Sequence, residues 1–249
     1  MGKVGSRSVS NSLVEHGLHP VINIHRINPK SIQRVRAEQQ KHRQRPKNEK
    51  IGLWLYRNIC RNPRQKAKVI TLVREPISRN ISAFFQNYQR FTGYKYQESN
   101  LQTDKLIKLF LTGYKHEVPL TWFNNEIKQT LGIDVYEFEF PKEQGYLEIR
   151  DGRFELLVIK MEIPDQCKAV AIAKFLCLEH FKLKRSNIGV KKIYSEVYRN
   201  FREKICLPEI YVDQMLKSSY ALHFYSMDEL ENIRKTWRIK QAREQDNFK

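Results

Sequence analysis

The sequence is poor in cysteine and contains no long apolar run. Its four cysteines, Cys60, Cys167, Cys177 and Cys206, are widely spaced and form no C-x-x-C pair. This spacing indicates neither a disulfide framework nor a zinc site. No apolar run approaches the ~20 residues that a membrane-spanning helix needs. We therefore expect a folded protein of the reducing cytoplasm that requires no metal.

Acidic residues are scarce too, which leaves a formal net charge of +18. The excess concentrates between Arg26 and Lys68, where fourteen Lys and Arg residues face only Glu38 and Glu49. A nucleic acid, an anionic membrane surface, or an anionic substrate and cofactor would each explain this segment, and so would a solvated helix face. Residues 28–53 contain no aromatic side chain, which makes nucleic acid the least favoured partner.

The first residues form a glycine-rich pattern, typical of a turn that leads into a helix. Glycines let backbone N–H groups approach an anion closely, and Ser6 and Ser8 add hydroxyl donors at the positive end of the helix dipole. Because Lys3 precedes the second glycine, Gly5, the pattern is not a Walker A loop. Taken alone, it could equally be a helix cap.

A second motif follows about seventy residues later. The β-branched run 69–73 ends in Arg74, Pro76 then favours the start of a helix, and Ser82 follows Arg74 by eight residues. A guanidinium and a hydroxyl on one side of a strand-to-helix turn can hold a phosphate, together with the helix N-terminus. Taken alone, Arg74 could equally be a surface arginine at a strand end.

Together the two motifs resemble those of the sulfotransferases that use 3′-phosphoadenosine 5′-phosphosulfate (PAPS). In that superfamily a Lys-x-Gly-Ser/Thr loop grips the 5′-phosphosulfate, and an Arg-Asp/Glu-Pro strand end with a Ser eight positions after the Arg grips the 3′-phosphate. The matching residues are Lys3, Gly5 and Ser6 in the first motif, and Arg74, Pro76 and Ser82 in the second. The resemblance implies PAPS as co-substrate and no metal.

Two parts of this resemblance concern further basic residues. Arg7 stands where the superfamily usually has a hydroxyl, and Ser8 can substitute for it. The segment 187–192 resembles the late loop that closes over the 3′-phosphate, which would add Lys191 and Lys192 to the nucleotide site. A basic loop before a helix is an equally good interpretation of these two lysines.

More narrowly, the chain resembles a bacterial family of capsular polysaccharide synthesis proteins. The segments that carry this likeness are residues 119–128, 132–136, 140–146 and 219–226. The resemblance implies an enzyme that transfers a sulfuryl group to a hydroxyl or amine acceptor, which would be a carbohydrate or a capsular polysaccharide precursor.

Alternating strand and helix patterns predict one α/β domain over residues 1–249, a size that can bury one substantial core. We expect a P-loop-type, mostly parallel sheet flanked by helices, with residues 165–249 mainly helical. The expected strands are 21–25, a central strand 68–73, and a hairpin over 146–160 that turns at Asp151-Gly152. A phosphate loop of this kind follows a buried strand. Because Met1 lies within the loop, we expect the first strand to be missing and to be encoded upstream.

Sulfuryl transfer needs in-line positioning and neutralisation of the leaving group. Lys3 is the candidate for the leaving oxygen. Glu126 is the first candidate for the general base, since residues 122–126 cluster an aromatic side chain, amides and a carboxylate, although it could simply be a charge on a helix surface. His16 and His116 are the other candidates, because imidazole titrates near neutral pH.

Two other functions remain open from the sequence. A P-loop kinase for a small molecule would need the lysine after the second glycine and an acidic Mg²⁺ ligand, and Glu75 is instead followed by proline. A non-catalytic protein that binds anions or polysaccharides is the second alternative, favoured by Arg7 and by the early position of Met1.

Overall fold

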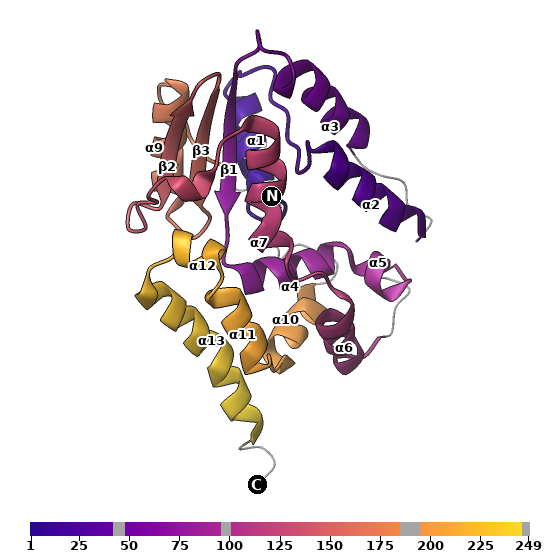
Figure 1. Ribbon diagram of the computed structural model, residues 1–249. Helices are drawn as coiled ribbons and strands as arrows, with labels where there is room; N and C mark the ends of the chain where they lie inside the picture. Colours follow the sequence, from indigo (N-terminus) through magenta and orange to yellow (C-terminus); the bar gives the residue numbers. More distant parts are fainter. Residues whose placement is uncertain (42–47, 96–100, 185–194, 246–249) are drawn as a thin grey trace. The chain divides into compact units, whose positions relative to one another are not determined.

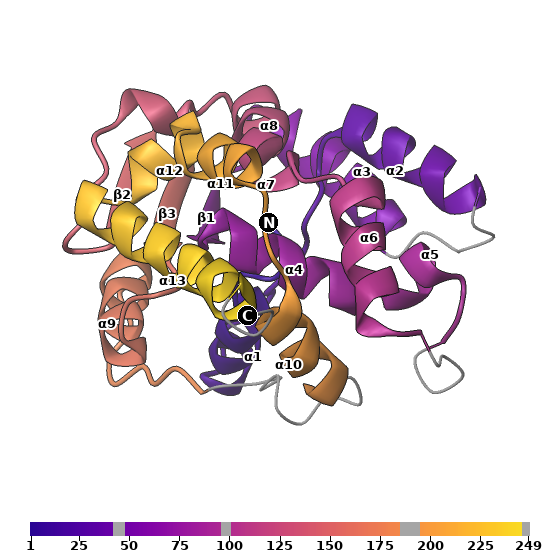
Figure 2. The same ribbon diagram turned by 90° about the horizontal axis from the view of Figure 1, so that it is seen from below.

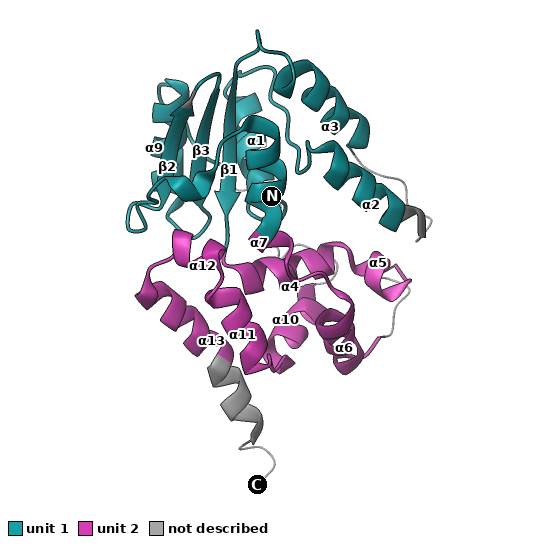
Figure 3. Ribbon diagram, in the orientation of Figure 1, with its two compact units in different colours: residues 1–74, 121–186 teal, residues 75–120, 187–249 magenta. Residues whose placement is uncertain are grey.

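The computed structural model describes residues 1–41, 48–95, 101–184 and 195–245. These residues cluster into two compact units, each built from two stretches of sequence (Figure 3). Unit 1 comprises Met1–Arg74 and Thr121–Ser186, and unit 2 comprises Glu75–Leu120 and Asn187–Lys249. Whether the chain behaves as one domain stays a prediction, and the units are described separately.

Unit 1 contains a three-stranded mixed sheet in the order β1-β3-β2 (Figure 1). The strands are β1 (Ala67–Val73), β2 (Tyr146–Asp151) and β3 (Phe154–Lys160). β3 runs parallel to β1 and antiparallel to β2. The predicted strand 68–73 and the predicted hairpin are therefore confirmed. The described sheet is not mostly parallel, however, and its central strand is β3 rather than β1.

The predicted strand 21–25 is wrong, because the structure describes this segment as irregular. Its backbone groups bind side chains instead of a strand: the indole of Trp122 donates to the carbonyl of His25 at 3.0 Å. The hairpin turn is shifted by one residue as well. Asp151 pairs with Phe154, so the turn residues are Gly152 and Arg153, with Gly152 at φ +63°.

The helices of unit 1 include α9, which packs against β2 and β3, whereas α2 and α3 lie farther from the sheet (Figures 1 and 2). The helices of this unit are α1 (Ser6–Glu15), α2 (Pro29–Lys41), α3 (Glu49–Leu55) with the π-helical turn η1 (Tyr56–Cys60), η3 (Phe123–Lys128), α8 (Gln129–Leu131), η4 (Val135–Glu137) and α9 (Asp165–Leu176). One of the three sequence boundaries between the units, between Leu120 and Thr121, falls inside α7 (Val118–Trp122).

Unit 2 is helical and has an aromatic core. Its helices are α4 (Pro76–Gln86), α5 (Tyr88–Thr92), α6 (Thr103–Gly113), α10 (Ser195–Lys204), α11 (Glu209–Leu216), α12 (Ser219–Phe224) and α13 (Met227–Gln245). Phe84, Phe85, Phe110 and Phe201 are fully or almost fully buried, and their rings lie 5.0–6.0 Å apart in the contacting pairs. None of the helices among the described residues is long and apolar enough to cross a membrane.

Local signals in the sequence place these helices well. Ser226 and Glu229 form the expected capping box: the Ser226 N–H donates to the Glu229 carboxylate at 2.8 Å, and the Glu229 N–H donates to Ser226 Oγ at 3.2 Å. Pro76 opens α4, as predicted. Such signals act within one helical turn, so the start of a helix can be predicted from them without knowledge of its tertiary contacts.

A buried polar network crosses the core of unit 2. Arg79 donates to the hydroxyl of Tyr114 at 2.9 Å and to Asn80 Oδ1 at 3.0 Å, and Asn80 donates to the carbonyl of His116 at 2.9 Å. Both ring nitrogens of His116 are engaged, Nε2 with the Phe110 carbonyl at 2.9 Å and Nδ1 with the Tyr211 hydroxyl at 3.0 Å. A carbonyl accepts only, so Nε2 carries the proton and the Tyr211 hydroxyl donates to Nδ1.

Burial gives this network a defined protonation state. Desolvation lowers the pKa of His116 and raises the pKa of Tyr211, so that the imidazole is neutral and the phenol keeps its proton. His116 thus has a structural task in unit 2 that its sequence did not reveal.

Gly52 in α3 tests how closely the helices of unit 1 pack. A Cβ at this buried position would lie 2.5 Å from the carbonyl oxygen of Arg26 and 2.8 Å from Cδ1 of Ile32. We expect Gly52→Ala to lower the free energy of unfolding by about 1–3 kcal/mol in urea titrations followed by circular dichroism. Gly113→Ala is the matched control, since nothing lies within 4 Å of its Cβ, and equal losses in both variants would contradict the packing.

The His116 network predicts a pH dependence of stability. Because its pKa is lower in the folded chain than in the unfolded chain, the unfolded state takes up the proton first as the pH falls below about 6.5. The contribution of His116 is therefore complete above that pH and is lost on acidification. His116→Gln should lose less stability than wild type between pH 7 and pH 5, whereas the difference at pH 8 measures the altered packing and hydrogen bonds of the neutral side chain. Equal pH slopes would show that His116 is not buried as a neutral group.

Candidate functional site

The glycine-rich turn leads directly into the N-terminus of α1. Gly5 is the N-cap residue, with φ +85°, and Lys3 also has a positive φ, +69°. A positive φ is uncommon for a residue with a side chain and is typical of functional turns. Met1 and Val4 are buried and anchor the turn, and the N-cap residue of α1, Gly5, has no side chain with which to cap the helix. The positive end of this ten-residue helix therefore points at the turn that carries Lys3.

Arg74 joins this turn to the end of β1. Its Nη1 donates to the carbonyl oxygen of Lys3 at 3.3 Å. Gly5 lies against the same strand, because a Cβ there would be 3.9 Å from Leu72 Cδ2. Two motifs far apart in the sequence thus meet within unit 1, at the carboxyl end of β1. In open α/β sheets this edge is where ligands bind.

Lys160 brings a second basic residue to the same edge, and the sequence did not indicate it. β1 and β3 are parallel and Val73 pairs with Lys160, so both strands end there. The Lys160 side chain is 1% exposed, and its ammonium donates to the carbonyl of Lys142 at 3.1 Å. Its backbone N–H donates to the carbonyl of Gly145 at 2.7 Å. Lys160 thereby holds the loop 140–145 and places a buried positive charge at the end of β3.

Gly145 in this loop cannot carry a side chain. Its φ is +74°, and a Cβ would lie 2.3 Å from Cγ2 of Ile163. The steric clash and the positive φ explain why a glycine occupies position 145 in the segment 140–146.

His25 lies beside the glycine-rich turn. A Cβ built on Gly2 would be 3.5 Å from Cδ2 and 3.7 Å from Nε2 of the His25 ring, so the imidazole lies next to the residue that precedes Lys3. The His25 side chain is exposed, while its backbone carbonyl accepts from the Trp122 indole. No motif in the sequence marks His25, because a histidine at the end of a short apolar run is a weak signal.

Glu126 holds the chain just after His25. Its side chain is buried, 3% exposed, and Oε2 accepts from the backbone N–H groups of Ile27 at 2.7 Å and Asn28 at 3.0 Å. Asn28 completes the attachment, because its amide donates to the Asn125 carbonyl at 2.7 Å and to Gln129 Oε1 at 2.8 Å. The bonds from the two backbone N–H groups to the Glu126 carboxylate are charge-assisted, and such bonds are stronger than neutral ones. The cluster 122–126 therefore anchors the segment that carries His25.

Of the other predicted site residues, His16 lies at the far end of α1 from the glycine-rich turn. His16 follows the last residue of α1, about 15 Å along the helix from Ser6, and its ring contacts Phe181. Arg7 is exposed and Ser8 half-buried on the first turn of α1. Ser82 lies half-buried on α4 and belongs to unit 2. Lys191 and Lys192 lie outside the described residues.

The N-terminus of α4 is already capped. The carboxylate of Glu75 accepts from the N–H groups of Ile77 and Ser78, both at 2.7 Å. The N–H groups that the sequence analysis assigned to a phosphate are thus occupied by this carboxylate. Any phosphate contact of this motif would depend on the side chains of Arg74 and Ser82.

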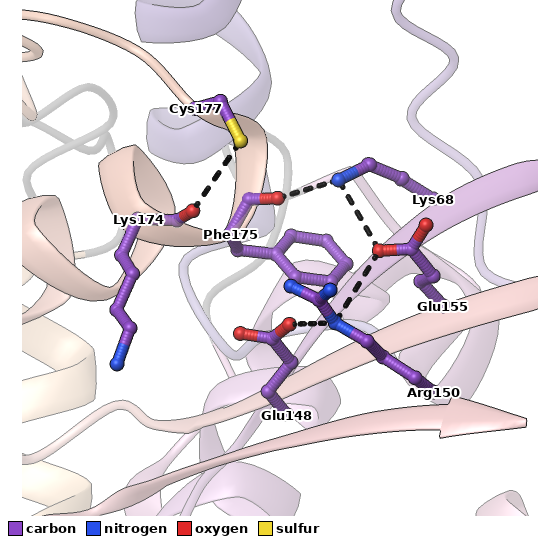
Figure 4. Close-up of polar contacts among 7 residues, drawn as sticks. All are labelled: Lys68, Glu148, Arg150, Glu155, Lys174, Phe175 and Cys177. Atoms are coloured by element: carbon purple, nitrogen blue, oxygen red, sulfur yellow. Dashed lines mark hydrogen bonds and ion pairs between the residues drawn. The ribbon is translucent and has the colours of Figure 1, made fainter.

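The opposite end of the sheet has paired charges (Figure 4). Lys68, Glu155 and Arg150 lie side by side on the three strands, and Glu155 forms ion pairs with Lys68 at 3.2 Å and Arg150 at 3.8 Å. Lys68 also donates to the carbonyl of Phe175 at 2.7 Å, near the C-terminus of α9. These contacts stabilise the sheet and its covering helix. Across the described residues, no three His, Cys, Asp or Glu side chains gather as a metal site would require.

Comparison with known proteins gives a family but no closer relative. Searches among curated proteins and among solved structures found no match. Residues 99–226, just over half of the chain, match the family described as "Putative capsular polysaccharide synthesis protein". The match begins after Lys3 and Arg74, and it includes Trp122, Glu126 and Lys160. This chain belongs to that capsular polysaccharide synthesis family.

Proposed function

We propose that this chain is a sulfotransferase-like enzyme that transfers a sulfuryl group from PAPS to a hydroxyl or amine of a carbohydrate acceptor. The observation that supports this most directly is the bond from Arg74 to the carbonyl of Lys3. It unites the two motifs that resemble the PAPS-binding motifs, at the strand edge where an α/β protein of the P-loop type would bind phosphate. The family supports a role in polysaccharide synthesis.

In this proposal the turn and α1 bind the 5′-phosphosulfate. Backbone N–H groups at the start of α1 and the hydroxyl of Ser6 would donate to its oxygens, and the helix dipole favours the negative charge. Arg74 would bind the 3′-phosphate, and the contacts from Ser82, Lys191 and Lys192 stay expectations that the resemblance implies. PAPS supplies the sulfuryl group, and the chain supplies binding, orientation and charge.

Lys3 has the role of stabilising the leaving group. As the S–O bond breaks, negative charge develops on the bridging oxygen of the nucleotide, and a lysine ammonium can donate to it. The strained backbone of Lys3 fixes the start of this side chain, and Arg74 fixes its carbonyl. Interactions that strengthen only as charge develops accelerate the reaction itself.

His25 is the residue best placed to accept the proton of the acceptor. Its ring lies beside Gly2, and imidazole is the side chain whose charge changes near neutral pH. Glu126 then acts as a positioning residue, through its bonds to Ile27 and Asn28. A carboxylate that already accepts two backbone N–H bonds and is 3% exposed is less accessible to an acceptor than an exposed imidazole.

Nucleotide selectivity tests the proposed function. The full chain should bind adenosine 3′,5′-bisphosphate far more tightly than AMP or ATP in calorimetry, because only the bisphosphate carries a 3′-phosphate. Arg74→Ala should lose roughly ten- to a hundredfold in affinity, as expected for one charge-assisted phosphate contact of about 1.5–3 kcal/mol. Arg64→Ala, which removes an exposed arginine before β1, is the matched control and should bind as wild type does. A preference for ATP with Mg²⁺ would overturn the proposal in favour of the kinase.

Kinetics separate the roles of His25 and Glu126. In release of the bisphosphate from PAPS, with a panel of oligosaccharide acceptors, His25→Asn should lower kcat by about 10²–10⁴-fold and leave bisphosphate affinity unchanged. Glu126→Gln should lower thermal stability and reduce kcat less, while keeping the acidic limb of the pH profile. If Glu126→Gln abolishes that limb and His25→Asn keeps it, Glu126 is the base. Bisphosphate binding without turnover in any acceptor would leave nucleotide recognition intact and refute the transferase.

A further inference from the structure

The outer surface of α2 and α3 combines exposed basic and apolar side chains. The two helices lie side by side (Figure 2), and an ion pair of 3.3 Å between Arg36 and Glu49 joins them. We call the following residues the α2–α3 surface: Arg34, Arg36, Lys50, Ile51, Trp54 and Arg57. All six are exposed, and all lie in unit 1.

Two large apolar side chains lie within this surface. Trp54 is 52% exposed and Ile51 45% exposed, and their spacing of three residues on α3 makes them neighbours on the helix. Single exposed apolar residues are ordinary, but a neighbouring Trp and Ile form a small apolar site. Gly52 between them is buried against Arg26 and Ile32, so the opposite side of α3 already has its packing partner.

Basic residues flank this apolar pair on the same helix. Lys50 precedes Trp54 by four residues and Arg57 follows it by three, in the turn η1 that continues α3. In the described part of residues 26–66, the two acidic side chains, Glu38 and Glu49, are only half-exposed, and Glu49 is paired with Arg36. The surface therefore has an excess of positive charge around an apolar centre.

We propose that the α2–α3 surface binds the surface of an anionic lipid bilayer. Trp favours the boundary between headgroups and acyl chains, and Ile51 gains from burial among the upper acyl carbons. The flanking Lys and Arg side chains meet the lipid phosphates, whose negative potential attracts basic segments. An extended polyanion such as a nucleic acid or an acidic glycan would use the charges and stack on Trp54, but it offers Ile51 nothing. The exposed pair of Ile51 and Trp54 therefore favours a lipid bilayer over a polyanion as the partner of this surface.

The test is sedimentation of the full chain with vesicles at 0.1 M salt. Vesicles of phosphatidylcholine and phosphatidylglycerol in equal parts should bind the protein, whereas phosphatidylcholine alone should bind it weakly. The double variant Lys50→Glu/Arg57→Glu should lower the binding constant at least tenfold, since each basic residue contributes about fivefold near an anionic surface. Trp54→Ala should also lower it about tenfold, and 0.5 M salt should weaken wild-type binding.

Two control variants make comparable changes at exposed positions outside the α2–α3 surface. Lys105→Glu/Lys108→Glu makes the same change in net charge on two exposed lysines of α6, and Ile210→Ser removes a side chain that is 80% exposed. Both controls should bind vesicles as wild type does, and circular dichroism verifies folding. Equal loss in the test and control charge variants, or unchanged binding of Trp54→Ala, would overturn the proposal. Retention on heparin without vesicle binding would assign the surface to a polyanion instead. None of these outcomes depends on PAPS.

Discussion

The carboxylate of Glu126 is the contact on which much of unit 1 depends. Buried at 3% exposure, it accepts two backbone N–H bonds from a segment almost a hundred residues earlier in the chain. The structure describes no strand in that segment, so the Glu126 carboxylate accepts the backbone N–H bonds that a neighbouring strand would otherwise accept. This attachment by Glu126 has two consequences. His25 lies beside Gly2, and Asn28, whose Oδ1 accepts from the N–H of Lys30 at 3.0 Å, sets the start of α2. The glycine-rich turn and the α2–α3 surface thus share one anchor.

This dependence explains what the sequence could reveal. Helix starts at Pro76 and Ser226 and the hairpin around Gly152 were predictable, because the interactions that determine them lie within a few residues. The run 21–25 was misassigned because its apolar, β-branched composition suits a strand, while Trp122, which bonds its last residue, and Glu126, which bonds the residues just after it, are remote in sequence. For the same reason Glu126 resembled a catalytic group, and His25 drew no attention.

The two ends of the sheet hold their basic side chains by different contacts. At one end, the carboxylate of Glu155 forms ion pairs with both Lys68 and Arg150. At the other end, the parallel strands β1 and β3 bring Arg74 and Lys160 to the same edge, where both donate to backbone carbonyls. These bonds fix where the two basic side chains lie. The excess of basic residues in the sequence could predict a basic site but not its position, because strand order decides which strand ends meet.

The family match and the phosphate motifs describe different halves of one arrangement. The match includes Trp122, Glu126, Gly145 and Lys160, which position the segment 25–28 and the loop 140–145. Of the residues proposed to meet the nucleotide, Lys3 and Arg74 precede the matched segment. A displacement of about an ångström at a reacting centre is enough to slow a transfer reaction greatly. In the proposed function, the matched half therefore contributes rigid contacts that fix the segment 25–28 and the loop 140–145.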